Sequence, residues 1–91
     1  MEITFDPVKN TRNIELRSLS FEEVVNFEFE TALFFPDQRQ DYGEVRIRAL
    51  GWLGKRLHAL VFVETRQGIR VVSFRKANKR EVNIYETQTK S

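Results

Sequence analysis

The sequence predicts an α+β fold in a single domain of residues 1–91, with a short N-terminal strand and two helices, an antiparallel meander sheet, and a C-terminal helix. Two observations support this prediction. Apolar and polar residues alternate with the period of two that is typical of strands across much of the second half. Helix-start signals come before that region and again after it. A chain of 91 residues with 41% apolar residues is large enough for one hydrophobic core.

The N-terminal elements follow from residues that favour helix starts. Residues 3–5 are predicted as a short strand. Asp6 is a good N-cap and the proline after it suits the first helical position, so a helix is expected up to about Arg17. Ser20 and Glu23 have the spacing of a capping box, which predicts a second helix. Its core-facing residues are expected to be Val24, Val25 and Phe27.

The sheet is predicted from alternation and from turn residues. Its four meander strands are expected at residues 33–35, 44–52, 57–65 and 69–75. Pro36 ends the first of these, and the polar segment after it is a loop. In the second strand Arg46 and Arg48 share a face. Gly51 and Gly54 are expected to bracket the turn that follows.

The last strand and the C-terminal helix complete the predicted fold. Strict alternation along residues 69–75 places Arg70 on one face of the sheet and Arg75 on the other. Asn78 followed by Glu81 three positions later is a second capping-box pattern, which predicts a helix. This helix carries Val82, Ile84 and Tyr85.

Charge is distributed unevenly between the two halves of the chain. Residues 1–45 hold four basic and ten acidic residues, a net charge of −6. Residues 46–91 hold eleven basic and three acidic residues, a net charge of +8. This asymmetry predicts a polyanion-binding surface built from the second half. The alternative is that acidic helices only neutralise basic strands within the domain.

Composition excludes several kinds of site. The chain has no Cys and one His. Disulfides, thiolate zinc sites, a cysteine nucleophile and a histidine metal cluster are therefore excluded, and no metal site is expected. The first five residues lack the features of a signal peptide, and the longest apolar run, residues 59–63, is far too short to span a membrane. We therefore expect a cytoplasmic protein with no membrane partner.

Basic residues of the second half are candidates for phosphate binding, because a guanidinium fork can donate to two phosphate oxygens at once. Arg70, Arg75 and Lys76 are the first candidates, and Arg46 and Arg48 are next. The alternative is a solvated strand face with weak ion pairs. Aromatic rings could stack on bases, although strand aromatics more often belong to a core. The rings in question are those of Trp52, Phe62, Phe74 and Tyr85.

Several motifs occur in a fixed order along the chain. They are Phe5-Asp6-x-x-Lys9-x-x-x-Asn13, Ser20-Phe21-Glu22-Glu23, Gly43-Glu44-x-Arg46, Thr65-Arg66, Ile69-Arg70-Val71-Val72-Ser73-Phe74-Arg75-Lys76-Ala77, and finally Glu81 with Tyr85. In this order and spacing the chain resembles the BrnT family, which are ribonuclease toxins of type II toxin–antitoxin systems. The resemblance covers nearly the whole chain.

The resemblance implies a RelE-like fold and an RNA substrate. It also implies a BrnA-like antitoxin as protein partner, contact with DNA only indirectly through the antitoxin complex, and no cofactor. One segment departs from the family. Where the family usually has Lys-His-Gly, this chain has Leu16-Arg17-Ser18. Arg17 keeps a cation for phosphate binding at that point, but its pKa is too high for it to donate a proton readily.

Metal-independent RNA cleavage by the 2′-hydroxyl needs a base, charge stabilisation of the phosphate, and a proton for the 5′-oxygen. Arg70 and Arg75 are the candidates for charge stabilisation. Glu44 is the candidate base, and His58 or Tyr85 the candidate proton carrier. Each of these has a structural alternative. Glu44 could pair with a nearby arginine, His58 could border the core, and Tyr85 could pack its helix on the sheet.

These residues favour two functions over a third, that of a structural or scaffold domain whose charge serves only solubility. The first is a ribonuclease toxin that a cognate antitoxin neutralises. The second is a catalytically weak or inactive toxin fold that binds an antitoxin or nucleic acid. Cleavage of RNA by the purified protein would separate them, because only the first function requires it.

Overall fold

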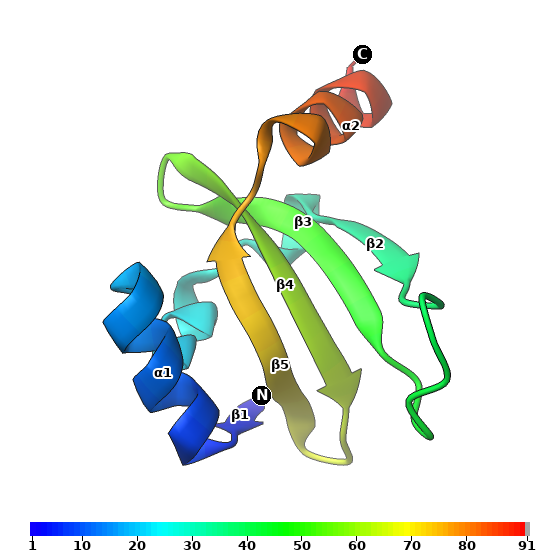
Figure 1. The fold of residues 1–91 in the computed structure, drawn as a ribbon. Helices are drawn as coiled ribbons and strands as arrows, with labels where there is room; N and C mark the ends of the chain where they lie inside the picture. Colours follow the sequence, from blue (N-terminus) through cyan, green and yellow to red (C-terminus); the bar gives the residue numbers. More distant parts are fainter. Residues whose placement is uncertain (91) are drawn as a thin grey trace.

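The computed structural model describes residues 1–90 as a five-stranded sheet with helices at its edges and on its faces (Figure 1). The strands are β1 (Glu2–Phe5), β2 (Leu33–Pro36), β3 (Ile47–Leu53), β4 (Arg56–Glu64) and β5 (Gly68–Lys76). Their order across the sheet is β1-β5-β4-β3-β2. Strands β2 to β5 pair antiparallel, which confirms the predicted meander, and β1 adds to it in parallel with β5. The α+β prediction is confirmed.

Two of the three predicted helices form as expected. Helix α1 (Pro7–Arg17) begins where the Asp6 carboxylate accepts a hydrogen bond of 2.9 Å from the backbone N–H of Val8. Helix α2 (Lys79–Thr89) begins with a complete capping box, in which Asn78 and Glu81 each accept from the other's backbone N–H at 2.9 Å. No helix within residues 1–90 is long and apolar enough to span a membrane.

The second predicted helix is wrong in type. Residues Phe21–Asn26 form a 3₁₀ helix, η1, and a shorter one, η2, follows at Phe29–Thr31. The carboxylate of Glu23 accepts from Asn26 and does not return to the cap, so the predicted capping box does not close there. With three residues per turn, Val24 and Phe27 point the same way and both are buried. Val25 lies on another face of η1 and is 70% exposed, which contradicts its predicted core position.

The two faces of the sheet differ in what covers them. On one face η1 packs into the larger core, which contains Phe21, Val24, Phe27, Ala49, Leu60, Phe62, Ile69, Val71 and Phe74. On the other face α2 covers one end, and Figure 1 shows the remainder of that face open. Tyr85 and Ala77 pack there against Leu50, Leu57 and Ala59. We call this partly covered side the open face.

A bulge in β5 changes the faces predicted for its arginines. Val61 pairs with Ser73 and Phe62 with Val71, so Val72 is an extra residue in the ladder. Beyond the bulge the alternation is inverted, and Arg70 and Arg75 both lie on the open face. The prediction that they occupy opposite faces is therefore wrong, because strict alternation does not allow for an inserted residue.

Of the two glycines expected to bracket the turn after β3, only Gly54 does so. Gly54 has φ +60° and forms the turn between β3 and β4, as expected. Gly51 does not bracket that turn but lies inside β3, beneath η1. A Cβ atom at Gly51 would come within 2.6 Å of the Phe27 ring and 2.9 Å of the Ala32 Cβ. Glycine is therefore required at this position by the close approach of Phe27.

Helix α1 is attached to the sheet by amide side chains. It contributes no buried residue. The Asn13 side chain donates to the backbone oxygens of Leu19 and Phe74, both at 2.9 Å, and the Asn10 side chain accepts from the N–H of Phe21 at 2.7 Å. These three hydrogen bonds fix α1 beside η1 and β5.

Candidate functional site

Basic side chains surround a small cleft on the open face. The cleft holds about 80 Å³ and lies between β3, β4, β5, the start of α2 and the segment before β3. Its charged lining residues are Arg39, Arg48, Arg75 and Glu81, and we call it the arginine cleft. Ser73 and Val61 form part of its floor. Three cations and one acid therefore line this cleft.

Arg75 is held in place by Glu81. Its two terminal nitrogens donate to the two carboxylate oxygens at 2.8 and 2.9 Å, and one also donates to the Lys76 carbonyl at 3.3 Å. Three of its five N–H donors are then used, leaving two for a ligand. The hydrogen bond from Arg75 lowers the pKa of the Glu81 carboxyl below its usual value. Glu81 is therefore a positioning group for Arg75 and a weak base.

The other two arginines of the cleft have different environments. Arg39 makes a paired contact with the buried Asp37, at 2.7 and 2.8 Å, and this contact lowers the pKa of the Asp37 carboxyl. Arg48 is half-buried on β3 and forms no ion pair with any carboxylate of residues 1–90. Among the cleft arginines, the charge of Arg48 is the least compensated.

A second group of charges lies on the open face at the other end of β5. Arg70 donates to both oxygens of Glu44, at 2.7 and 2.9 Å, and the Arg46 Nε donates to the same carboxylate at 3.1 Å. The Arg46 guanidinium also stacks 4.0 Å from the centre of the Tyr42 ring. We call these residues the Glu44 cluster. The hydrogen bonds from Arg70 and then Arg46 lower the pKa of the Glu44 carboxyl, which makes it a weak base at neutral pH.

The aromatic rings considered for base stacking belong mainly to the interior. Phe62, Phe74 and Tyr85 are 5%, 0% and 6% exposed, which confirms the core interpretation for these three. The Tyr85 hydroxyl donates to the Thr31 carbonyl at 2.9 Å, and its ring meets the Trp52 ring edge-on at 5.7 Å. Tyr85 does not line the arginine cleft.

The remaining predicted site residues lie on the face of the sheet opposite the arginine cleft. His58 pairs with Lys76 across β4 and β5, and the His58 ring packs 5.3 Å from the ring of Phe74. His58 and Lys76 line a pocket of about 350 Å³ together with Arg17, Ser18 and Leu19. We call this the His58 pocket.

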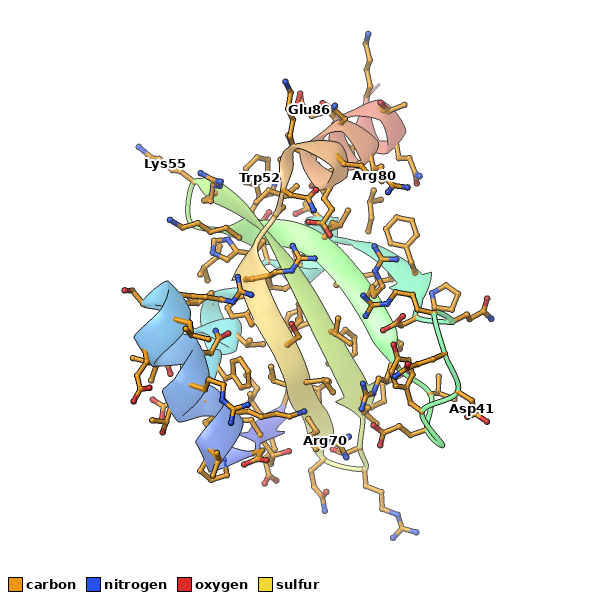
Figure 2. All side chains as sticks on the ribbon, viewed as in Figure 1. Asp41, Trp52, Lys55, Arg70, Arg80 and Glu86 are labelled. Carbon is orange, nitrogen blue, oxygen red and sulfur yellow. The ribbon has the colours of Figure 1, made fainter. Side chains whose placement is uncertain are left out.

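Apart from Tyr85, the predicted site residues therefore gather in three places. Figure 2 shows Arg70 at the end of β5 far from α2, which carries Arg80 and Glu86. The cleft residues Arg48 and Arg75, the Glu44 cluster, and the His58 pocket are separate groups. Sequence reasoning missed two cleft residues. Glu81 was recognised as a helix cap and as part of the family motif, but not as a partner of Arg75, which it follows by six residues. Arg39 lies in a loop segment with no pattern to single it out.

Comparison with known proteins identifies the family. No curated protein and no solved structure matches the chain. Residues 5–81 match the family model described as "Ribonuclease toxin, BrnT, of type II toxin-antitoxin system". The match begins at the last residue of β1 and ends at Glu81, so it spans the arginine cleft, the Glu44 cluster and the His58 pocket. The chain belongs to the BrnT family of ribonuclease toxins.

Proposed function

We propose that this protein cleaves RNA without a metal ion, by attack of the 2′-hydroxyl on the adjacent phosphate, and that the phosphate is bound in the arginine cleft. The observation that carries the proposal is the placement of Arg48 and Arg75. They extend from β3 and β5, on either side of β4, into one cleft on the open face. Membership of a ribonuclease toxin family supports RNA as the substrate.

The cleft suits a phosphate whose negative charge increases during the reaction. Arg75 keeps two N–H donors for phosphate oxygens while Glu81 holds its guanidinium in a fixed orientation. Arg48 supplies a second guanidinium without a carboxylate partner in residues 1–90. Donors that are oriented before the reaction stabilise the developing charge at no further cost in reorganisation.

Electrostatic stabilisation is the main contribution in this proposal, because the carboxylates near the cleft are weak bases. Neighbouring arginines lower the pKa of both Glu81 and Glu44. Glu44, the predicted base, instead orients Arg70 and Arg46 along the open face, where they could bind phosphates on one side of the cleaved bond. Tyr85, a predicted proton carrier, is assigned to packing.

The proposed protein partner is a BrnA-like antitoxin, which would inhibit the toxin by covering the basic open face. An acidic segment of the antitoxin would be attracted to that face by its excess of arginine. DNA would be contacted only through the toxin–antitoxin complex. We place the activity in the cytoplasm, where the RNA targets are.

The test is cleavage of RNA by purified protein in the presence of a metal chelator. Wild type is expected to leave 2′,3′-cyclic phosphate ends, and Arg75→Ala to abolish cleavage while retaining the circular dichroism spectrum of the wild type. Arg66→Ala is the matched control, because Arg66 is exposed at the β4–β5 turn and its replacement removes the same charge as Arg75→Ala does. Equal cleavage by wild type and Arg75→Ala would contradict the proposed site.

A second candidate function is a toxin fold that binds its antitoxin without cleaving RNA. The observation that favours it is Arg17 at the position where the family usually has histidine, because arginine does not readily transfer protons. Expression in bacteria separates the two functions. An active toxin arrests growth and a cognate antitoxin relieves the arrest, whereas an inactive one leaves growth unchanged at equal expression.

A further inference from the structure

The His58 pocket combines two cations and a histidine from three separate elements. Arg17 comes from the last residue of α1, His58 from β4 and Lys76 from the last residue of β5. Ser18 and Leu19 complete the lining, so no carboxylate lines the pocket. Neither Arg17 nor Lys76 forms an ion pair within residues 1–90. The pocket therefore has uncompensated positive charge.

One ring nitrogen of His58 is available in this pocket. The Nδ1 atom lies 2.9 Å from the backbone oxygen of Arg56 and so carries the proton in the neutral tautomer. The Nε2 atom has no hydrogen bond among residues 1–90. Every deeply buried side-chain nitrogen or oxygen in that range has a partner, so Nε2 must retain contact with solvent. Because His58 lines the pocket, we infer that Nε2 meets solvent there.

We propose that the His58 pocket binds a phosphate group of the RNA backbone at a position beside the one that is cleaved. This inference rests on the proposed function and adds a second phosphate site to it. Arg17 and Lys76 would attract the phosphate by charge. Protonated His58 would donate its Nε2–H to a phosphate oxygen, a charge-assisted hydrogen bond.

The course of β5 allows one RNA strand to reach both sites. Arg75 and Lys76 are consecutive, and their side chains point to opposite faces of the sheet, into the arginine cleft and the His58 pocket. Strand β1 pairs with β5 only as far as Val71, so no strand covers the outer edge of β5 near Lys76. Figure 1 shows this end of β5 between α1 and α2. A single strand crossing the edge there would place successive phosphates on the two faces.

Phosphate binding should change the titration of His58. Burial is the largest cause that lowers its pKa, and the positive charges of Arg56 and Lys76 lower it further. Arg17 is the other charged group that lines the pocket. A bound phosphate places negative charge beside the ring, so it raises the His58 pKa, and by linkage phosphate binds more tightly as the pH falls.

The experiment follows the ring signals of His58 by NMR, which are unambiguous because the chain has one histidine. The pKa is measured for the free protein, with inorganic phosphate, and with a 2′-O-methyl oligoribonucleotide that cannot be cleaved. We expect both ligands to raise the pKa. Lys76→Gln should weaken oligonucleotide binding by about tenfold, the loss of one charge-assisted hydrogen bond. Arg66→Gln, the control at the distant turn, should weaken it less than Lys76→Gln does.

The outcomes separate this inference from the proposed function. An unchanged His58 pKa with both ligands overturns the phosphate site, even if RNA is still cleaved. A rise with inorganic phosphate alone overturns RNA as the ligand of this pocket. Equal weakening by Lys76→Gln and Arg66→Gln overturns a local site in favour of general attraction. Because the oligonucleotide cannot react, none of these results depends on catalytic activity.

Discussion

Glu81 and Arg75 join the start of α2 to the end of β5 through two parallel hydrogen bonds of 2.8 and 2.9 Å. The same carboxylate also accepts from the backbone N–H of Asn78, which closes the cap of α2. The Glu81 side chain is 7% exposed and that of Arg75 is 31% exposed. One acid therefore both starts the C-terminal helix and orients a cation of the arginine cleft.

Replacement of Glu81 tests its structural role. Glu81→Gln keeps the shape and an acceptor for the cap but removes the negative charge beside Arg75. We expect a loss of about 2 kcal/mol in the free energy of unfolding, measured with urea at pH 7. Glu86→Gln, on the exposed side of α2, is the control and should change stability little.

The contribution of Glu81 to stability should depend on pH. Because the pKa of Glu81 is lowered in the folded state, this contribution is present above the usual value of 4.5 and is lost as the pH falls below it. The two proteins should therefore converge in stability in acid.

His58 predicts a second pH dependence, at higher pH. Burial lowers the pKa of His58 below the usual 6.5, so this side chain binds a proton more readily in the unfolded chain than in the folded one. Stability is then full above pH 6.5 and decreases as the pH falls below it. His58→Asn should show a smaller decrease between pH 7 and 5 in thermal unfolding. A variant that follows the wild-type curve in this range would show that another group is responsible.

Ser18 is a position where glycine should stabilise the fold. It ends α1 in the left-handed conformation, with φ 55°, which favours glycine. The resemblance to the BrnT family places glycine at this point of the motif. Ser18→Gly should raise the free energy of unfolding by about 0.5–1 kcal/mol. Ser18→Ala is the control, because alanine keeps the Cβ atom and should give no gain.

Gly51 should not tolerate a side chain. A Cβ atom there would lie 2.6 Å from the Phe27 ring, inside the packed core. We expect Gly51→Ala to cost about 1–3 kcal/mol in denaturant unfolding. If the steric explanation is right, Phe27→Leu should recover part of that loss when the two changes are combined. Additive losses would refute it.

Arg48 should matter to cleavage more than to folding. It lines the arginine cleft without an ion pair in residues 1–90. Arg48→Ala is expected to lower kcat/KM by about 100-fold, the usual effect of removing one donor to a developing charge. Arg48→Lys should restore only part of the activity, because a point charge lacks the fork. Unfolding curves of all three proteins should nearly coincide.

Local signals in the sequence were enough to predict most of the fold. The caps at Asp6 and Asn78, the alternation of the meander strands and the turn glycine Gly54 act over a few residues, and the structure confirms them. The type of η1 was not predictable, because a spacing of three lets Val24 and Phe27 face the core in either kind of helix. Only tertiary packing decides that this segment is a 3₁₀ helix with Val25 outside the core.

The candidate site was less predictable because it depends on register. The bulge at Val72 places Arg70 on the same face as Arg75. No residue type in β5 predicts this bulge. The pairing of Arg75 with Glu81 depends on how α2 returns over the sheet. Charge asymmetry between the halves located the basic strands, but not which carboxylates would neutralise individual arginines.

The attachment of α1 has a consequence for local stability. Since no side chain of this helix is buried, the amides of Asn10 and Asn13 supply most of what keeps it in place. It can detach at a lower free energy than the whole molecule unfolds. Backbone protons of residues 10–17 should exchange with deuterium well before those of β4. Each detachment of α1 would remove Arg17 from the His58 pocket and expose His58 to solvent. The hydrogen bonds of Asn10 and Asn13 therefore determine what fraction of the time this pocket is complete.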